Sequence, residues 1–184
     1  MRCYCVMHHG QPLEAVCRPV PQPQGTEVLV KVHAAGLCHT DLHLWEGHYD
    51  LGGGKKLALA DRGIKPPLTL SHEIVGQVAA AGAEAEGMVG ALAGRPVLIH
   101  PWIGCGECAA CKRGEENICI KPQSLGVARP GGFAEFDELR ELVALVKRIG
   151  MKAIPVARRL LSEANAALQD LQAGRVVGRA ILVP

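Results

Sequence analysis

Residues 105–119 read C-G-E-C-A-A-C-K-R-G-E-E-N-I-C, and the four cysteines follow the spacing C-x2-C-x2-C-x7-C. Four thiolates satisfy the tetrahedral coordination of Zn²⁺, and closely spaced cysteines in a loop can wrap around the ion. Gly104, Gly106 and Gly114 give the backbone the freedom to do so. The alternative is a loop of unligated reduced thiols. We predict a structural zinc site with four ligands, Cys105, Cys108, Cys111 and Cys119.

A tetrathiolate site leaves no coordination position open for a substrate. The loop at 104–120 is therefore expected to stabilise the fold, and the residues that determine the function must lie elsewhere in the chain.

The composition is that of an ordinary globular protein. The chain has 184 residues, of which 48% are hydrophobic and 21% charged, and its net charge is +2. This charge gives no field suited to nucleic acid, and aromatic residues, at 3%, are too scarce for base stacking. The 22 glycines and 12 prolines favour short strands and many turns. We expect a mainly β fold with a few helices (α+β) and no nucleic-acid partner.

Eight cysteines in a chain of this length raise the alternative of a secreted disulfide protein. However, the first residues, M-R-C-Y-C-V-M-H-H, contain no apolar signal core. No stretch approaches the roughly 18 apolar residues that a membrane span needs. We therefore expect reduced thiols, a cytoplasmic protein and no membrane partner. Cys3, Cys5 and Cys17 are expected to be small buried core residues.

Short apolar or β-branched runs between turn residues predict strands. The expected strands are 2–7, 28–34, 70–81, 96–101, 133–136 and 179–183. The run G-G-G-K-K at 52–56 lacks the spacing of a phosphate-binding loop and is expected to be a surface loop.

Two later stretches have the spacing of amphipathic helices. In 137–149 the apolar positions are Leu139, Leu142, Val143, Val146 and Ile149. In 162–173, Ser162 is the expected N-cap and Gly174 the stop. The buried stripe of this second helix is expected to be Ala164, Ala167, Leu168 and Leu171.

A second set of metal-binding residue types lies in two separate segments. One reads G-L-C-H-T-D-L-H over 36–43, and the other reads S-H-E over 71–73. Cysteine and histidine are zinc ligands, and a catalytic zinc needs three protein ligands and an open position. Thr40 is suited to pass a proton and Asp41 to orient a ligand histidine. From the residues alone, a core cysteine and an ordinary polar histidine remain the alternative.

Four segments, in this order, resemble a zinc-dependent alcohol dehydrogenase of the medium-chain dehydrogenase/reductase superfamily. They read G-L-C-H-T-D-L-H-L-W-E-G, P-L-T-L-S-H-E-I-V-G, C-G-E-C-A-A-C-K-R-G-E-E-N-I-C and G-G-F-A-E-F. The resemblance implies a GroES-like partial β-barrel over residues 1–136, zinc loop included. Residues 137–184 would supply the C-terminal helices and strand that complete the domain.

The resemblance also implies a catalytic zinc. Cys38 and His72 would bind the ion, Glu73 would lie next to it, and Asp41 would hydrogen-bond His72. The structural zinc would be held by Cys105, Cys108, Cys111 and Cys119.

Further roles follow from the same resemblance. Thr40 would touch the alcohol oxygen and begin a proton relay that His43 finishes, His39 would face the cofactor pyrophosphate, and Trp45 would line the substrate pocket. The reaction would oxidise a small alcohol to an aldehyde or ketone, with hydride transfer to NAD.

The chain departs from the family pattern where the nucleotide-binding domain would stand. Family members carry that domain after G-G-F-A-E-F, but here Phe136 leads directly into the predicted helix at 137–149. No G-x-G-x-x-G follows a strand, and no acidic residue is placed for a ribose. We expect no Rossmann domain and a largely missing NAD site, as in a dehydrogenase whose cofactor domain has been deleted. The apolar face of 137–149 would then pack on its own barrel or drive a homo-oligomer.

The third cysteine ligand of the catalytic zinc, which the family carries beyond G-G-F-A-E, has no counterpart here, because no cysteine follows Cys119. Ser71 also stands where the family usually has glycine, and Arg95-Pro96 where Gly-Asp-Arg is common. We expect the catalytic domain of a zinc-dependent alcohol dehydrogenase, inactive or weakly active alone. The alternative is a zinc-stabilised, non-catalytic metal-binding scaffold or interaction module.

Overall fold

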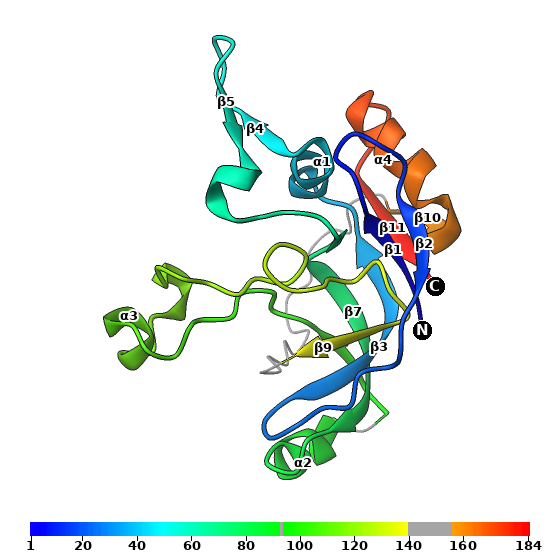
Figure 1. Ribbon diagram of the computed structural model, residues 1–184. Coiled ribbons are helices and arrows are strands. Elements are labelled where there is room, and N and C mark those ends of the chain that lie inside the picture. Colours follow the sequence, from blue (N-terminus) through cyan, green and yellow to red (C-terminus); the bar gives the residue numbers. More distant parts are fainter. Residues whose placement is uncertain (93, 140–155) are drawn as a thin grey trace.

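The computed structural model describes residues 1–92, 94–139 and 156–184 (Figure 1). The strands are β1 (Arg2–Val6), β2 (Glu14–Cys17), β3 (Val28–Gly36), β4 (His48–Asp50), β5 (Lys56–Ala58), β6 (Leu68–Thr69), β7 (Glu73–Ala81), β8 (Pro96–Leu98), β9 (Phe136–Leu139), β10 (Val156–Leu160) and β11 (Arg179–Val183). The α-helices are α1 (His39–Glu46), α2 (Glu86–Val89), α3 (Ala109–Lys112) and α4 (Ala164–Gln172). Short 3-10 turns lie at Leu59–Arg62, Gly90–Leu92, Glu116–Ile118 and Leu161–Glu163.

Strand β3 is the centre of a six-stranded sheet with the order β10-β11-β3-β7-β8, in which β9 also pairs with β3. One edge of β3 pairs with β7 along its whole length. The other edge is divided, because β9 pairs with Val28–Lys31 and β11 pairs with Ala35 and Gly36. The sheet therefore joins β3, from the first part of the chain, to the last strand, β11, as Figure 1 shows.

The G-G-F-A segment at 131–134 precedes β9 of this sheet and hydrogen-bonds to β1 and to the end of β6 in the smaller sheet β2-β1-β6. On one side, the backbone N–H of Tyr4 donates to the carbonyl of Phe133 at 2.8 Å. On the other side, Gly131 donates to Thr69 at 2.9 Å and Phe133 donates to Leu70 at 3.0 Å. The segment therefore packs against the backbone of the residues that lead to His72.

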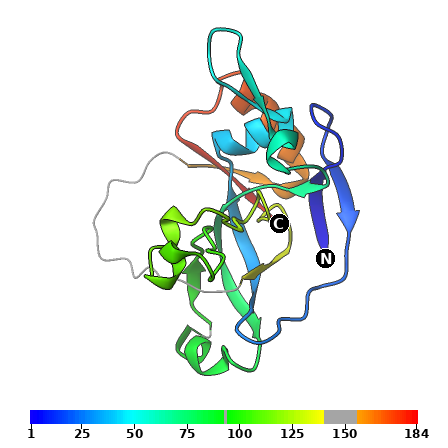
Figure 2. The same ribbon diagram turned by 60° about the vertical axis from the view of Figure 1, so that its left-hand side comes forward.

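Helix α4 packs beside α1 near the first strands (Figure 2). The side-chain amide of Asn165 accepts from the N–H of Leu13 at 2.6 Å and donates to its carbonyl at 3.1 Å. Ala164, Ala167 and Leu168 are buried in the main core. The C-terminal residues are thus part of the same core as the site-bearing helix α1.

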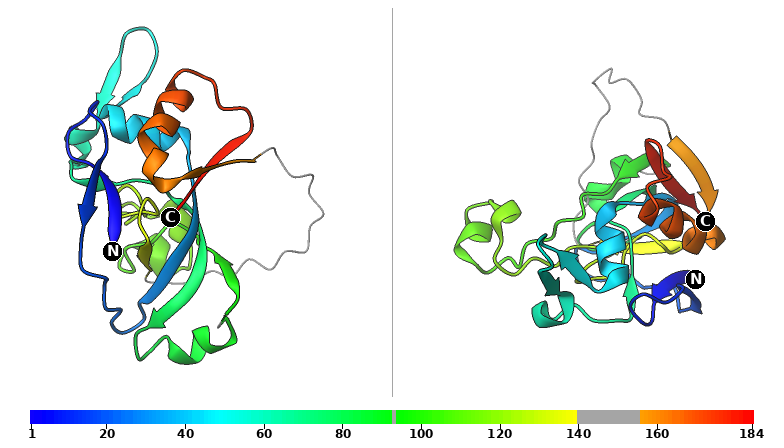
Figure 3. Two further views of the ribbon diagram at one scale, coloured as in Figure 1. Left: turned by 90° about the vertical axis from the view of Figure 1, so that its right-hand side faces the viewer. Right: turned by 90° about the horizontal axis from the view of Figure 1, so that it is seen from above.

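Two loops project from the β lobe (Figure 3). One carries α3 and the four clustered cysteines, and the other is the β4–β5 hairpin with its exposed glycine turn at 52–54. The expectation of a surface loop at 52–56 is confirmed.

The mainly β architecture is confirmed, and the strands expected near 2–7, 28–34, 70–81, 96–101 and 179–183 are present. The described residues form no doubly wound parallel sheet. Among their strands, β10 and β11 pair in parallel. The expected strand at 133–136 instead begins at Phe136, because Gly131–Phe133 are taken up by pairing with residues 69–71.

Three expectations were wrong in detail. Residues 137–139 belong to β9 and not to a helix, because they pair with the open edge of β3; the rest of the expected helix lies outside the described residues. Cys3 and Cys5 are buried, but Cys17 is exposed at the end of the edge strand β2. Ser162 is not an N-cap. The 3-10 turn begins before it, and the carboxylate of Glu163 accepts from the N–H of Leu160 at 2.7 Å.

The close contact behind the His72 loop is testable at Gly131. A Cβ atom there would lie 2.0 Å from the carbonyl oxygen of Ser71, so Gly131→Ala must displace backbone. We expect a loss of about 1–3 kcal/mol in unfolding free energy, measured by urea denaturation.

The matched control is Gly87, which lies in α2 with no atom within 4 Å of an added Cβ. Gly87→Ala should leave stability unchanged or raise it slightly. Equal stabilities of the two variants would contradict the close packing at Gly131.

Candidate functional site

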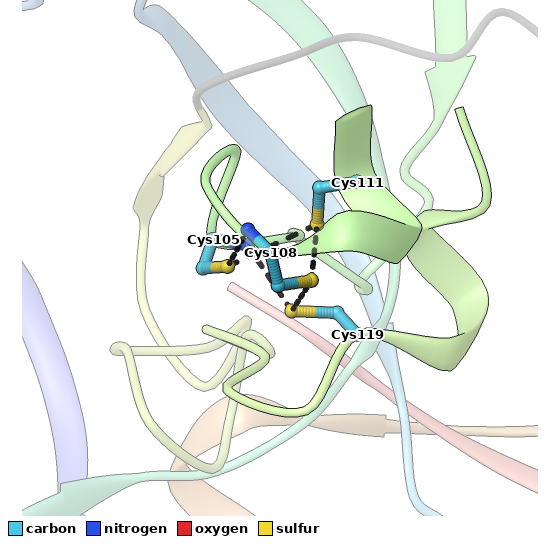
Figure 4. A group of neighbouring side chains, drawn as sticks. All are labelled: Cys105, Cys108, Cys111 and Cys119. Atoms are coloured by element: carbon cyan, nitrogen blue, oxygen red, sulfur yellow. Dashed lines mark hydrogen bonds between the residues drawn. The ribbon is translucent and has the colours of Figure 1, made fainter. Parts of the chain in front are cut away.

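The four cysteines of the projecting loop converge on one point (Figure 4). Their sulfur atoms all lie within 4.8 Å of one another, and those of Cys108 and Cys111 are 3.5 Å apart. None of the eight cysteines forms a disulfide. This is the donor set and the clustering that a tetrahedral zinc ion requires.

The backbone of the loop is arranged to stabilise thiolates. Backbone N–H groups donate to sulfur from Cys105 to Cys119 at 3.3 Å, from Cys108 to Cys105 at 3.4 Å and from Lys121 to Cys119 at 3.4 Å. A backbone hydrogen bond from Cys111 is the largest cause that lowers the pKa of Cys108, to about 6. Desolvation is the largest cause that raises the pKa of Cys111, to about 12. Four such sulfurs cannot all be thiolates without a cation between them, so the site fits Zn²⁺.

The second metal-binding group combines the two separated segments. One donor atom each from Cys38, His72 and Glu73 lies within 4.8 Å of the others. The register of the central sheet brings them together, because Gly36 at the end of β3 pairs with Glu73 at the start of β7. Gly36 is required for this approach, since a Cβ atom there would lie 2.4 Å from Oε2 of Glu73.

Asp41 binds both segments. Its fully buried carboxylate accepts from the N–H of Cys38 and from the N–H of Ser71, each at 2.8 Å. Burial raises the pKa of Asp41 to about 6, and these two hydrogen bonds oppose the rise. The hydrogen bond from Asp41 to His72 that the resemblance implies is not among the contacts of the described residues, where the carboxylate bonds to backbone.

Ser71 is the residue before His72 and has a φ of 75°, in the left-handed region that favours glycine. Its side chain is fully buried, and its Oγ donates to the carbonyl of Gly36 at 2.9 Å. The residue thus combines an unfavourable backbone conformation with a second hydrogen bond between the two ligand segments.

Two observations fit a metal ion at this group. Nδ1 of His72 is buried and has no hydrogen-bond partner among the described residues, although such groups are rarely left unpaired. Glu73 directs one oxygen to Arg179 of β11, at 3.1 Å, and the other toward Gly36. A thiol, an imidazole and a carboxylate form a donor set that zinc accepts.

The other residues singled out from the sequence lie on α1. Oγ1 of Thr40 is 3.7 Å from the sulfur of Cys38. The ring of His43 contacts His39 and Tyr49, with centroids 5.1 and 4.8 Å away. Trp45 donates its indole N–H to the carbonyl of Gln11 at 2.6 Å.

A cavity of about 940 Å³ reaches this group. Thr40 and His72 line it, as do Tyr49 and Trp102, which the sequence analysis did not single out. Trp45 is not among the lining residues. Neither Tyr49 nor Trp102 stands in a recognisable motif, so only the folded chain shows that they face the cavity.

The fold and the two donor sets define a zinc-binding β lobe of the kind found in dehydrogenases. The family model for the alcohol dehydrogenase GroES-like domain matches residues 24–147. The chain belongs to the zinc-type alcohol dehydrogenases of the medium-chain dehydrogenase/reductase superfamily, through their GroES-like domain.

Among its relatives, the NAD-dependent alcohol dehydrogenase of Sulfurisphaera tokodaii is 36% identical over 157 residues, or 85% of this chain and 43% of that protein. The L-threonine 3-dehydrogenase of Pyrococcus horikoshii is 33% identical over 95% of this chain and 46% of that protein. The crystal structure of the D-arabinose dehydrogenase from Sulfolobus solfataricus is 28% identical, with a TM-score of 0.62 over 80% of this chain and 41% of that one. The chain thus spans less than half the length of these relatives.

Within the described residues, no helix has both the length and the apolar character to cross a membrane.

Removal of one ligand tests the clustered cysteines. Cys111→Ser should lower the zinc content of the purified protein by one ion per chain. It should also reduce its thermal stability strongly, because structural zinc contributes apparent binding energies of about 10–16 kcal/mol in small zinc peptides. Zinc analysis and thermal melting measure both effects. Exposed Cys17 provides the control, since Cys17→Ser should change neither.

Ser71 can be tested with a pair of variants. Ser71→Ala keeps the left-handed backbone and removes the hydrogen bond to Gly36, so we expect a loss of about 1–3 kcal/mol in unfolding free energy. Ser71→Gly also removes that bond but relieves a backbone cost of roughly 1–2 kcal/mol. It should therefore be the more stable of the two in urea denaturation. The reverse order would refute the strain at Ser71.

Proposed function

We propose that this chain is the metal-binding and alcohol-binding lobe of a zinc-dependent alcohol dehydrogenase. Cys38, His72 and Glu73 would hold the catalytic zinc, and the four clustered cysteines would hold the structural one. The observation that carries the proposal is the convergence of a thiol, an imidazole and a carboxylate beside a cavity.

The donor count supports a catalytic metal site. Three protein ligands leave one position of a tetrahedral ion for a water or an alcohol oxygen, unlike the closed tetrathiolate site. Glu73 then supplies the third ligand that the family takes from a later cysteine. The ion pair with Arg179 engages one oxygen of this carboxylate, Oε1, and holds the side chain in place.

When bound, zinc acts as a Lewis acid that lowers the pKa of an alcohol near neutral pH. The chain itself must orient the alcohol and remove its proton. Thr40 is positioned for the first step, because it lines the cavity and lies beside Cys38. His43 follows one helical turn later, and its Nδ1 is 4.0 Å from the carboxylate of Glu46. We infer that the proton passes from Thr40 to His43 and then to solvent.

The nicotinamide cofactor does not fit the described residues. They contain no strand–turn–helix unit with a glycine-rich turn. His39 is exposed, and its ring lies 5.1 Å from that of His43. We therefore derive no hydride step, and we propose that the chain does not oxidise alcohols with NAD unaided.

The relatives indicate small alcohols, aldehydes or ketones as ligands, and the unpaired cysteines are consistent with a cytoplasmic protein. Self-association, expected from the apolar positions in 137–149, remains a prediction. A zinc-stabilised scaffold without catalytic metal is the competing function.

Zinc stoichiometry distinguishes the two. We expect two zinc ions per chain in the parent protein and one in His72→Ala, which should keep the structural ion. One ion in both proteins would support the scaffold instead.

An NAD titration tests the proposal that the chain does not oxidise alcohols with NAD unaided. Calorimetry of the zinc-loaded chain should show no NAD binding at micromolar concentrations, and no NADH should form with a primary or secondary alcohol. Tight binding or turnover would contradict the proposal that the chain is inactive alone.

A further inference from the structure

Five cationic side chains and no carboxylate line the cavity beside the candidate catalytic metal. The cations are Arg18, Arg62, Lys65, Lys121 and Arg129. The chain has 20 lysines and arginines against 18 aspartates and glutamates, so its composition does not explain this segregation. The five residues come from distant parts of the chain, around residues 18, 62–65 and 121–129, and only folding brings them to one cavity.

These cations lack acidic partners. The ion pairs of the described residues lie elsewhere, and none involves any of the five side chains. Arg18 has one polar side-chain contact, from Nη2 to the sulfur of Cys5 at 3.7 Å. Arg18 and Arg129 are half-buried, whereas the other three are exposed. Guanidinium groups that have lost part of their water favour an anion with planar or phosphate geometry.

Arg18 and Arg129 also line a neighbouring cavity of about 590 Å³. Asp137 lines only the neighbouring cavity. The cavity that contains Thr40 and His72 therefore has no acidic side chain in its own lining.

We infer that the substrate is an alcohol that carries an anionic group, either a carboxylate or a phosphate. Its hydroxyl would lie at Thr40 and the metal, and its anion against Arg18 and Arg129. This inference rests on the proposed function and adds the substrate class to it. A neutral alcohol would leave these cations without partners, so it would gain none of the charge-assisted hydrogen bonds that the anion makes.

The test compares ligands that differ in charge. We would titrate the zinc-loaded chain with 3-hydroxybutyrate, glycerol 3-phosphate and the neutral 1,3-butanediol by calorimetry. At least one anion should bind roughly tenfold or more tightly than the diol, and added salt should weaken that preference.

Variants assign the preference to the arginines. Arg129→Gln should reduce anion binding to the level of the diol and leave diol binding unchanged, and Arg18→Gln is the second variant in case one fails to fold. Exposed Arg158 of β10 has no ion pair among the described residues and does not line the cavity, so Arg158→Gln should change nothing. Equal binding of anions and diol, or no effect of either cavity variant, would overturn the inference.

Two further arms separate this inference from the proposed function. In the cobalt-substituted protein, the visible absorption of the ion should change when the bound anion's hydroxyl reaches it. If anion binding depended on the arginines but left the absorption unchanged, the anion site would be supported and the proposed catalytic metal site would be refuted. The protein could instead bind ADP and neither anionic alcohol, and Arg129→Gln could abolish that ADP binding. This result would assign the cations to a nucleotide site and overturn the inference.

Discussion

One buried carboxylate, that of Asp41, holds the two halves of the candidate catalytic centre together. It accepts hydrogen bonds from the backbone N–H groups of Cys38, which precedes α1, and of Ser71, which lies between β6 and β7. Desolvation disfavours the charged form, and hydrogen bonds to both oxygens offset part of that cost. Because these bonds go to backbone and not to a flexible side chain, they set the positions of two whole segments. That placement brings the thiol of Cys38 and the imidazole of His72 close to each other.

Glycine and serine make the placement sterically feasible. Gly36 lets Glu73 approach β3, and Gly131 lets the G-G-F segment lie against the backbone of Ser71. Ser71 itself adopts a left-handed conformation and adds a hydrogen bond to Gly36. The His72 loop is thus held from three sides, by Asp41, by β3 and by residues 131–133. A metal ion bound there would meet ligands that are already in position, which is the arrangement that tight and directional coordination requires.

The two candidate metal groups differ in their surroundings. The four cysteines sit in a projecting loop whose N–H groups point at sulfur, and their four thiolates complete the coordination of an ion. The Cys38, His72 and Glu73 group offers three donor atoms, and its His72 lines a cavity. Cationic side chains also line this cavity, so a bound metal and the positive charge would together determine which ligands it accepts. The closing strand β11 joins this centre through Arg179 and Glu73, which links the end of the chain to the site.

The sequence alone was sufficient where a property depends on residue type and short spacing. The cysteine spacing, the H-E pair, the strands β1, β3, β7, β8 and β11, and the buried positions Ala164, Ala167 and Leu168 of α4 could all be predicted, because a few neighbouring residues encode them. Contacts between distant segments could not. The helical spacing in 137–149 competed with an open edge on β3, and at residues 137–139 the sheet prevailed. The backbone partners of Asp41, the conformation of Ser71 and the gathering of five cations around one cavity depend on the register of strands far apart in the chain. No local pattern reports that register, so only the tertiary structure decided them.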